Sequence, residues 1–160
     1  MNILKFPNPF LTTATYEVTV FGDELKVLLD SMYEAMKANN GLGLAANQVG
    51  LLHRMFVMDG LEGRFNIVNP VIINKSAKPA NIKEGCLSAP GDFVVIPERA
   101  EWIQLEFQDE AGNKRHAVFK GIRAVCAQHE IDHLNGQVFL SNKSIPKHER
   151  KRLEKKWGIK

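Results

Sequence analysis

Two histidines one helical turn apart, with a glutamate beside the first, are the strongest candidates for chemistry in this sequence. The stretch QHEIDHL contains His129, Glu130 and His133. Residues four apart on a helix project from one face, so the two imidazoles can hold one metal ion. Glu130 is turned about 100° from His129, where it can exchange a proton with a water that the ion acidifies. A solvated helix face is the simpler alternative, and the adjacent glutamate favours the metal site over it.

The third ligand decides which class of reaction such a site performs. One group of zinc proteases has a third histidine six residues after the second, but Phe139 stands there. The downstream carboxylates, Glu149 and Glu154, lie among lysines and arginines, where exposed ion pairs along a helix are the simpler expectation. Cys126 shares the face of the histidines, but its Cα should lie about 10 Å from that of His133. We therefore expect Cys126 to line the site rather than bind the ion.

Cys86, in the stretch EGCLS, is the remaining candidate for the third ligand. A thiolate and two imidazoles would leave one coordination position open, which suits catalysis, whereas structural zinc sites usually have four protein ligands. A lone cysteine is more often a buried core residue. The chain has only two cysteines, too few for a disulfide framework. The residues alone leave both interpretations of Cys86 open.

Three stretches, in this order and at these spacings, resemble the motifs of the peptide deformylase family. They are GLGLAANQ at 41–48, EGCLS at 84–88 and QHEIDH at 128–133. The resemblance covers nearly the whole chain. It implies a metal-dependent hydrolase that removes the N-formyl group, as formate, from the formyl-methionine of newly made polypeptides. A zinc peptidase with the same histidine helix and a non-catalytic metal-binding protein are the alternatives.

The resemblance also implies a role for each residue of the metal motifs. Cys86, His129 and His133 would bind one divalent ion, with the fourth position left to water. Ferrous iron would be the natural ion, and zinc, nickel or cobalt could replace it. Glu130 would serve as general base and then as general acid.

Further residues would bind the substrate, again by resemblance. Gln48 and the backbone N–H of Leu87 would donate to the developing oxyanion, and Gly43 would pair its backbone with the peptide. The methionine side chain would enter an apolar pocket formed by Leu42, Ile82, Ile122, Val125 and Cys126. The family usually has a substrate-binding arginine about where Phe93 stands, so preferences beyond the methionine are open. Asp132 is expected to face away from the ion and to pair with Arg99.

The elements that position these residues predict an α+β fold. Apolar spacing predicts a helix capped by Asp23 and ending at 39–41, a second helix at 122–134 that carries the histidines, and a third after Pro146. Short strands are expected at 54–59, 65–73, 92–97, 101–107 and 114–119, the last two joined by a hairpin at 109–113. Strands do not alternate with helices, which favours mainly antiparallel sheets packed around the central motif-bearing helix.

Length and charge complete the expectations. The 160 residues suit one deformylase-like domain, 1–160, with a basic helix at 146–160. No apolar run approaches the roughly 18 to 20 residues that cross a bilayer, so we expect a cytoplasmic protein. We also expect the protein to be a monomer. Residues 147–160 hold seven basic and two acidic side chains, whereas residues 1–146 hold 14 basic and 16 acidic ones. This tail is expected either to contact ribosomal RNA phosphates or to remain a solvated helix.

Overall fold

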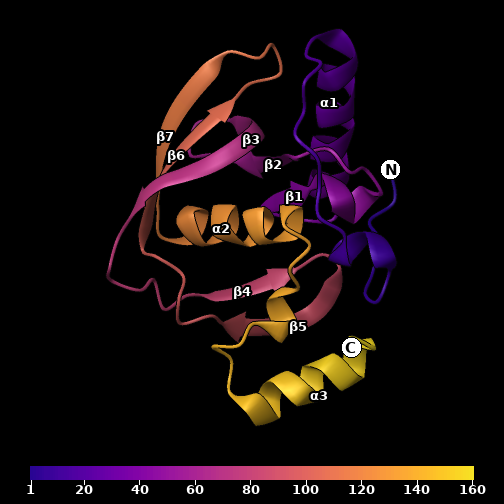
Figure 1. The fold of residues 1–160 in the computed structure, drawn as a ribbon, viewed down its shortest axis with the longest axis vertical. Coiled ribbons are helices and arrows are strands. Elements are labelled where there is room, and N and C mark those ends of the chain that lie inside the picture. Colours follow the sequence, from indigo (N-terminus) through magenta and orange to yellow (C-terminus); the bar gives the residue numbers. More distant parts are fainter.

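The computed structural model describes residues 1–160 and confirms an α+β fold with antiparallel sheets (Figure 1). The helices are α1 (Asp23–Ala38), α2 (Ile122–Leu134) and α3 (Lys147–Trp157), with 3₁₀ turns at Pro9–Thr12, Ala46–Val49 and Phe139–Ser141. The strands are β1 (Gly43–Ala45), β2 (Met55–Asp59), β3 (Arg64–Lys75), β4 (Lys83–Cys86), β5 (Ala89–Val95), β6 (Trp102–Gln108) and β7 (Lys114–Lys120).

Helix α2 lies between two separate sheets. The larger sheet has the strand order β1-β2-β3-β6-β7 with every neighbouring pair antiparallel, and β4 and β5 form a hairpin of their own. Figure 1 shows α2 crossing the middle of the molecule, with the larger sheet on one side and the hairpin on the other. The two sheets therefore deliver side chains to the same helix from opposite directions.

The larger sheet is covered on both faces near β2, and the alternation of side chains along that strand explains why. Phe56 and Met58 belong to the core cluster that includes α2, whereas Met55 and Val57 belong to the cluster that includes α1. Because successive side chains of a strand point to opposite faces, a continuous apolar run fits a strand buried on both. This packing fixes β1, the edge strand beside β2, against α2.

Gly136 lets the chain turn at the end of α2, where the backbone of the N-terminal segment is close. Gly136 follows the helix with φ 71°, and a Cβ there would lie 2.9 Å from the carbonyl oxygen of Thr12. Left-handed backbone and a close backbone neighbour both favour glycine. The end of the motif helix is thus packed directly on the N-terminal segment.

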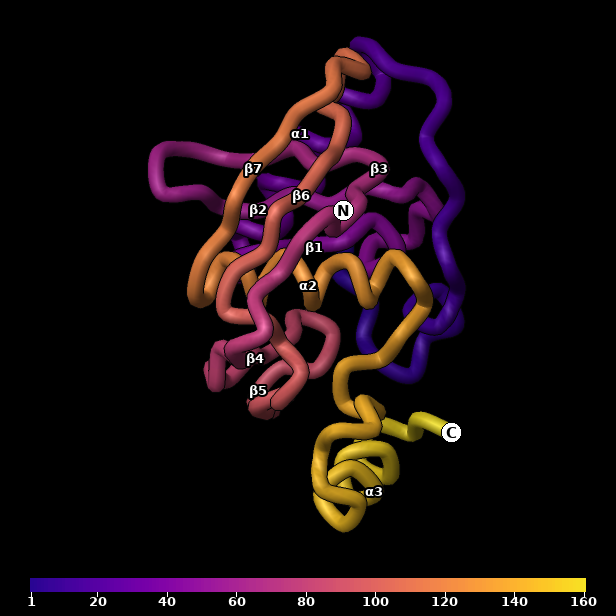
Figure 2. Tube along the Cα trace, turned by 60° about the vertical axis from the view of Figure 1, so that its left-hand side comes forward, coloured from indigo at the N-terminus to yellow at the C-terminus, as the bar shows by residue number.

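Helix α3 packs beneath the β4–β5 hairpin, as Figures 1 and 2 show. Its one fully buried side chain, Leu153, joins a core cluster with Val94 and Ile96. Lys156 Nζ and Trp157 Nε1 each donate to Asp92 on β5 over 2.8 Å. The C-terminal helix therefore supports the hairpin that carries Cys86.

Every predicted helix and strand is present, with end points that differ by up to three residues, as where β5 begins at Ala89 instead of residue 92. Three further features differ. Helix α1 begins at Asp23 as predicted, but Gly22 is its N-cap residue, with φ 124°, so the prediction that Asp23 caps it was wrong. Strands β1 and β4 were not assigned, because three and four residues are too short to show an alternating pattern.

None of the helices combines the length and the apolar character that crossing a membrane requires.

Candidate active site

Helix α2 places His129 and His133 one turn apart in the interior. Both side chains are buried, and their Nε2 atoms are 3.1 Å apart. Burial lowers the pKa of His133 well below its usual value. At His129 the hydrogen bonds with Cys86 and Glu84 outweigh burial and raise the pKa well above its usual value. Phe139, which occupies the position of a possible third histidine, packs its ring 4.9 Å from that of His129. That position helps enclose the pair instead of adding a ligand.

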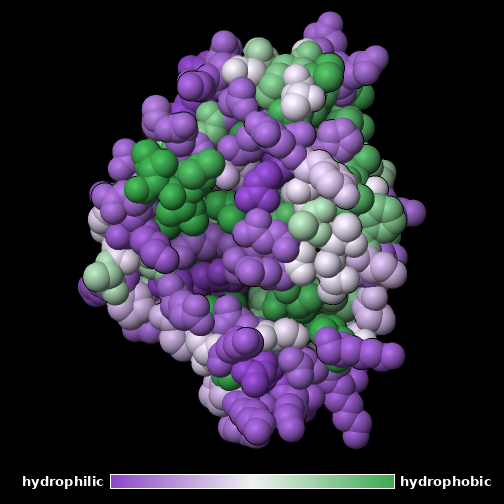
Figure 3. Space-filling model, in the orientation of Figure 1, coloured by the Kyte–Doolittle hydropathy of each residue, from purple (hydrophilic) through white to green (hydrophobic).

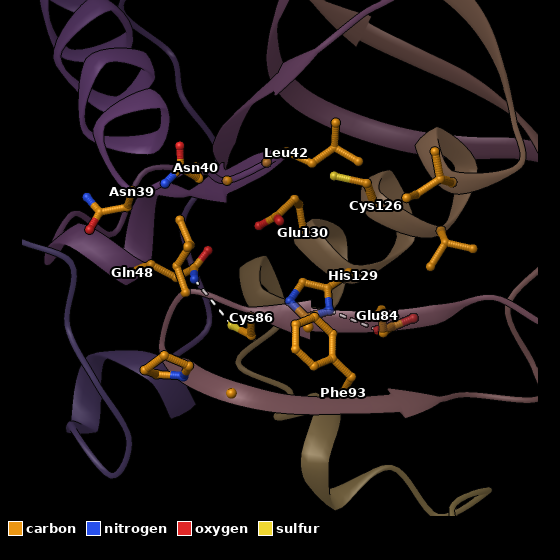
Figure 4. Close-up of a pocket in the computed structure, with 18 residues that line it drawn as sticks. Asn39, Asn40, Leu42, Gln48, Glu84, Cys86, Phe93, Cys126, His129 and Glu130 are labelled. Atoms are coloured by element: carbon orange, nitrogen blue, oxygen red, sulfur yellow. Dashed lines mark hydrogen bonds and ion pairs between the residues drawn. The ribbon is translucent and has the colours of Figure 1, made fainter.

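The β4–β5 hairpin brings Cys86 to the two histidines. Its Sγ lies 3.2 Å from His133 Nε2, and the donor atoms of the three residues all lie within 4.8 Å of one another. Ligands about 2.0 to 2.3 Å from one tetrahedral ion lie roughly 3.3 to 3.6 Å apart, so the spacing is close to that of a ligand set. The backbone N–H of Ser88 also donates to this sulfur over 3.4 Å. The three residues therefore fit one divalent ion; Figure 4 shows two of them, Cys86 and His129.

A buried polar network behind the histidines fixes their orientation. His129 Nδ1 lies 2.9 Å from Glu84 Oε1, which leaves Nε2 directed toward the other ligands. Glu84 also accepts two hydrogen bonds from Arg99, over 2.9 and 2.7 Å, and Arg99 donates a third to Asp132 over 2.6 Å. The predicted pairing of Asp132 with Arg99 is confirmed. Through this network one guanidinium holds together the hairpin strand β4 and the motif helix.

Glu84 stays ionised in this network although it is buried. Burial raises the pKa of its carboxyl, but the hydrogen bonds from Arg99 and His129 outweigh that effect and hold the pKa below its usual value. The charge is retained only because these partners surround it.

Glu130 lines the cavity beside the metal ligands, and one of its carboxylate oxygens has no hydrogen-bond partner. Its carboxylate is buried, and Oε2 makes no hydrogen bond. Burial raises the pKa of Glu130 to about 7. On the facing strand β1, a Cβ on Gly43 would lie 2.8 Å from Glu130 Oε1 and 2.6 Å from Cys126 Sγ. Glycine at that position is what permits the strand to approach the helix so closely.

Gln48 directs its amide N–H₂ toward the ligands. Its Oε1 accepts a hydrogen bond from the N–H of Ala45 over 2.9 Å, which fixes the orientation of the amide. Nε2 then donates to Ser88 Oγ over 3.1 Å and contacts Cys86 Sγ at 3.5 Å. The N–H of Leu87, in the turn between β4 and β5, donates to no group of the chain. Both are donors available beside the metal ligands.

A cavity of about 370 Å³ opens onto Glu130 and the ligand cluster. Its apolar lining includes Leu42, Ile122, Val125 and Cys126. Burial raises the pKa of the Cys126 thiol well above its usual value, in keeping with a neutral wall residue. Ile82, predicted as a further wall residue, does not line the cavity, because it precedes β4 at the end of the strand farther from Cys86. Its place in the methionine pocket therefore stays a prediction.

The comparisons with known proteins place this site in a family. A sequence model of polypeptide deformylase matches residues 1–150. The chain belongs to the polypeptide deformylase family. Peptide deformylase of Pseudomonas aeruginosa is 39% identical over 97% of this chain and 95% of its own length. Among solved structures, the peptide deformylase of Plasmodium falciparum superposes with a TM-score of 0.89 at 33% identity, over 98% of this chain and 93% of that one. The Ehrlichia chaffeensis peptide deformylase bound to actinonin superposes with a TM-score of 0.87 at 39% identity, over 98% of this chain and 94% of that one.

Membership in the deformylase family settles the class of reaction. The chain is a metal-dependent hydrolase that removes the N-formyl group from nascent polypeptides. The zinc peptidase alternative is set aside, because the family model and the relatives named above are all deformylases.

The deformylase site contains functional residues that the sequence alone did not reveal. Glu84 and Ser88 belong to the EGCLS stretch, but only its cysteine and the following leucine were assigned roles. Arg99 lies 15 residues after Glu84, and no spacing rule links the two. One signal in the sequence could have identified Glu84. It stands two residues before the candidate ligand Cys86, and metal-bound histidines usually donate a hydrogen bond to a carboxylate.

Removing Arg99 should destabilise the fold strongly. Arg99→Met leaves the buried Glu84 carboxylate without its main partner, so the free energy of unfolding should fall by about 3 to 5 kcal/mol. Adding Glu84→Gln should recover part of this loss. The measurement is urea unfolding of the metal-free chain, with tryptophan fluorescence as the signal.

Arg115→Met is the matched control, because Arg115 pairs with Asp109 on the surface. This substitution should lower the free energy of unfolding by less than about 1 kcal/mol. Equal losses for Arg99→Met and Arg115→Met would contradict the role of the buried network.

Proposed function

We propose that Cys86, His129 and His133 hold the catalytic ion, and that the ion is ferrous iron in the cell. The mutual distances of their donor atoms, and the hydrogen bond between His129 and Glu84, support this ligand set. When bound, the ion would lower the pKa of water enough to supply hydroxide near neutral pH. Zinc, nickel or cobalt could occupy the same donors, since thiolate and imidazole suit all of them.

Glu130 is proposed to move the protons of the reaction. A formamide is a weak electrophile, so the attacking water must lose a proton, and Glu130 lines the cavity with one carboxylate oxygen that makes no hydrogen bond. It would take that proton and pass it to the departing nitrogen. The formyl C–N bond then breaks, the oxygen of water ends in formate, and the peptide leaves with a free amino terminus.

Gln48 and the N–H of Leu87 are proposed to stabilise the negative charge that builds on the formyl oxygen. The support for Gln48 is its fixed amide, which keeps Nε2 on the cavity side. A well-placed donor of this kind is worth roughly 3 kcal/mol, or about a hundredfold in rate.

Strand β1 is proposed to bind the peptide backbone through Gly43. It is an edge strand of the larger sheet, paired only with β2, and residues 41–43 line the cavity. An extended peptide can add to such an edge through main-chain hydrogen bonds. The methionine side chain would then enter the apolar part of the cavity lined by Leu42, Ile122, Val125 and Cys126.

Glu130→Gln tests the proposed catalytic roles most directly. The chain is purified without oxygen, its metal content is measured, and formate release from formyl-Met-Ala-Ser is followed. The variant should keep its metal and lose at least about a hundredfold in rate, because it cannot carry the proton. Glu34→Gln, an exposed glutamate on α1, is the control and should match the parent. Equal activity in Glu130→Gln and the parent would contradict the assignment.

We further propose that the chain acts as one domain and as a monomer in the cytoplasm, where nascent peptides are made, and that α3 contacts the ribosome. Six of the seven basic side chains in 147–160 are exposed, while Leu153 is buried on the inner face. Figure 3 shows an almost wholly hydrophilic surface at the α3 end of the molecule. Exposed cations of this kind can bind RNA phosphates, although a solvated helix would look the same.

Cosedimentation with bacterial ribosomes at two salt concentrations separates these possibilities. Binding should weaken steeply with salt, and Lys151→Glu with Lys155→Glu should remove most of it. Lys114→Glu with Lys120→Glu, the same charge change on β7, should have little effect. No binding, or equal loss in both pairs, would favour the solvated helix. Sedimentation of the free chain in the same series reports whether it is a monomer.

A further inference from the structure

An exposed aromatic side chain stands at the mouth of the cavity. Phe93, on β5, is 64% exposed and lines the cavity together with Glu84 and Glu130. No lysine or arginine lines this cavity. The lining therefore offers an apolar ring at the mouth and no lysine or arginine that could pair with an acidic group.

The position of this ring is set by the strands that carry it. A Cβ on Gly85 would lie 2.6 Å from Cε1 of Phe93, so the ring lies directly against the backbone of β4. Asp92, the preceding residue, is held from the other side by Lys156 and Trp157. Because neighbouring side chains of a strand point to opposite faces, anchoring Asp92 keeps Phe93 turned toward the cavity.

The ring lies across the cavity from the apolar wall proposed for the methionine. Figure 4 shows Leu42 and Cys126 on one side and Phe93 on the other, with Glu130 and His129 between them. In an extended peptide, consecutive side chains also point in opposite directions. A methionine side chain directed at Leu42 and Cys126 would therefore direct the next side chain toward Phe93.

We propose that Phe93 determines specificity for the residue that follows the methionine, selecting apolar and aromatic side chains over acidic ones. The inference rests on the proposed binding of the peptide at β1. An apolar side chain would cover the exposed ring and remove both surfaces from water, and an aromatic one could also stack on it. A carboxylate at the same place would lose water against an apolar face, with no lysine or arginine in the lining to pair with it.

The test compares kcat/KM for formyl-Met-X-Ser peptides with Phe, Leu, Ala or Asp at X, measured as formate release by the metal-loaded chain. The parent should favour Phe and Leu over Asp by about three- to tenfold. Phe93→Ala should remove most of this preference, and Phe93→Arg should shift it toward Asp. Val95→Arg is the matched control, because Val95 lies on the same face of β5 but does not line the cavity; it should keep the preference of the parent.

The outcomes separate the two levels of the proposal. Formate release that does not depend on X in the parent, or a preference unchanged in Phe93→Ala, would overturn the role of Phe93 while leaving the proposed catalytic site intact. A shift toward Asp in Val95→Arg equal to that in Phe93→Arg would also overturn it, because the effect would then be one of general surface charge. No formate from any peptide would contradict the proposed site as well as the inference.

Discussion

Helix α2 carries ionisable and amide side chains into the interior, and each polar group buried there needs a partner. Gln128 meets this requirement with the backbone of Ala100, accepting from its N–H over 2.9 Å and donating to its carbonyl over 3.0 Å. His129 meets it with Glu84, and Glu84 in turn requires Arg99. The partners come from β4 and from residues 99–100, just before β6, so satisfying α2 ties it both to the hairpin and to the segment that enters the larger sheet.

The same constraint produces the reactive centre. Because Glu84 is held by Arg99 and His129, strand β4 is fixed against α2, and Cys86 at its end lies beside His133. On the opposite side, Gly43 lets β1 approach Glu130 and Cys126, which narrows the cavity between the edge strand and the ligands. Three side-chain atoms of α2 depart from this rule, since Arg123 Nε, His133 Nδ1 and one oxygen of Glu130 make no hydrogen bond; of the three residues, only Glu130 lines the cavity. An unsatisfied group at this place is costly for the fold but available to a substrate.

Much of this arrangement could be predicted from sequence, and the remainder had physical reasons for being hidden. The helix at 122–134 and the hairpin at 109–113 follow from local patterns, and the structure has both. Cys86 could be proposed only by comparing motifs, because no local rule connects it to histidines more than forty residues away. The bridging role of Arg99 and the exclusion of Ile82 from the cavity depend on how β4 pairs and packs, which a single sequence does not encode in any short stretch.

The central claim is that the hairpin and the helix together form one ligand set of a thiolate and two imidazoles. X-ray absorption at the K-edge of the bound ion tests it most directly, with the chain loaded with zinc or ferrous iron. The spectrum should show one sulfur neighbour at roughly 2.3 Å and two imidazole nitrogens at roughly 2.0 to 2.1 Å, and Cys126→Ala should leave it unchanged. A first shell without sulfur, or a sulfur signal lost in Cys126→Ala, would contradict the account.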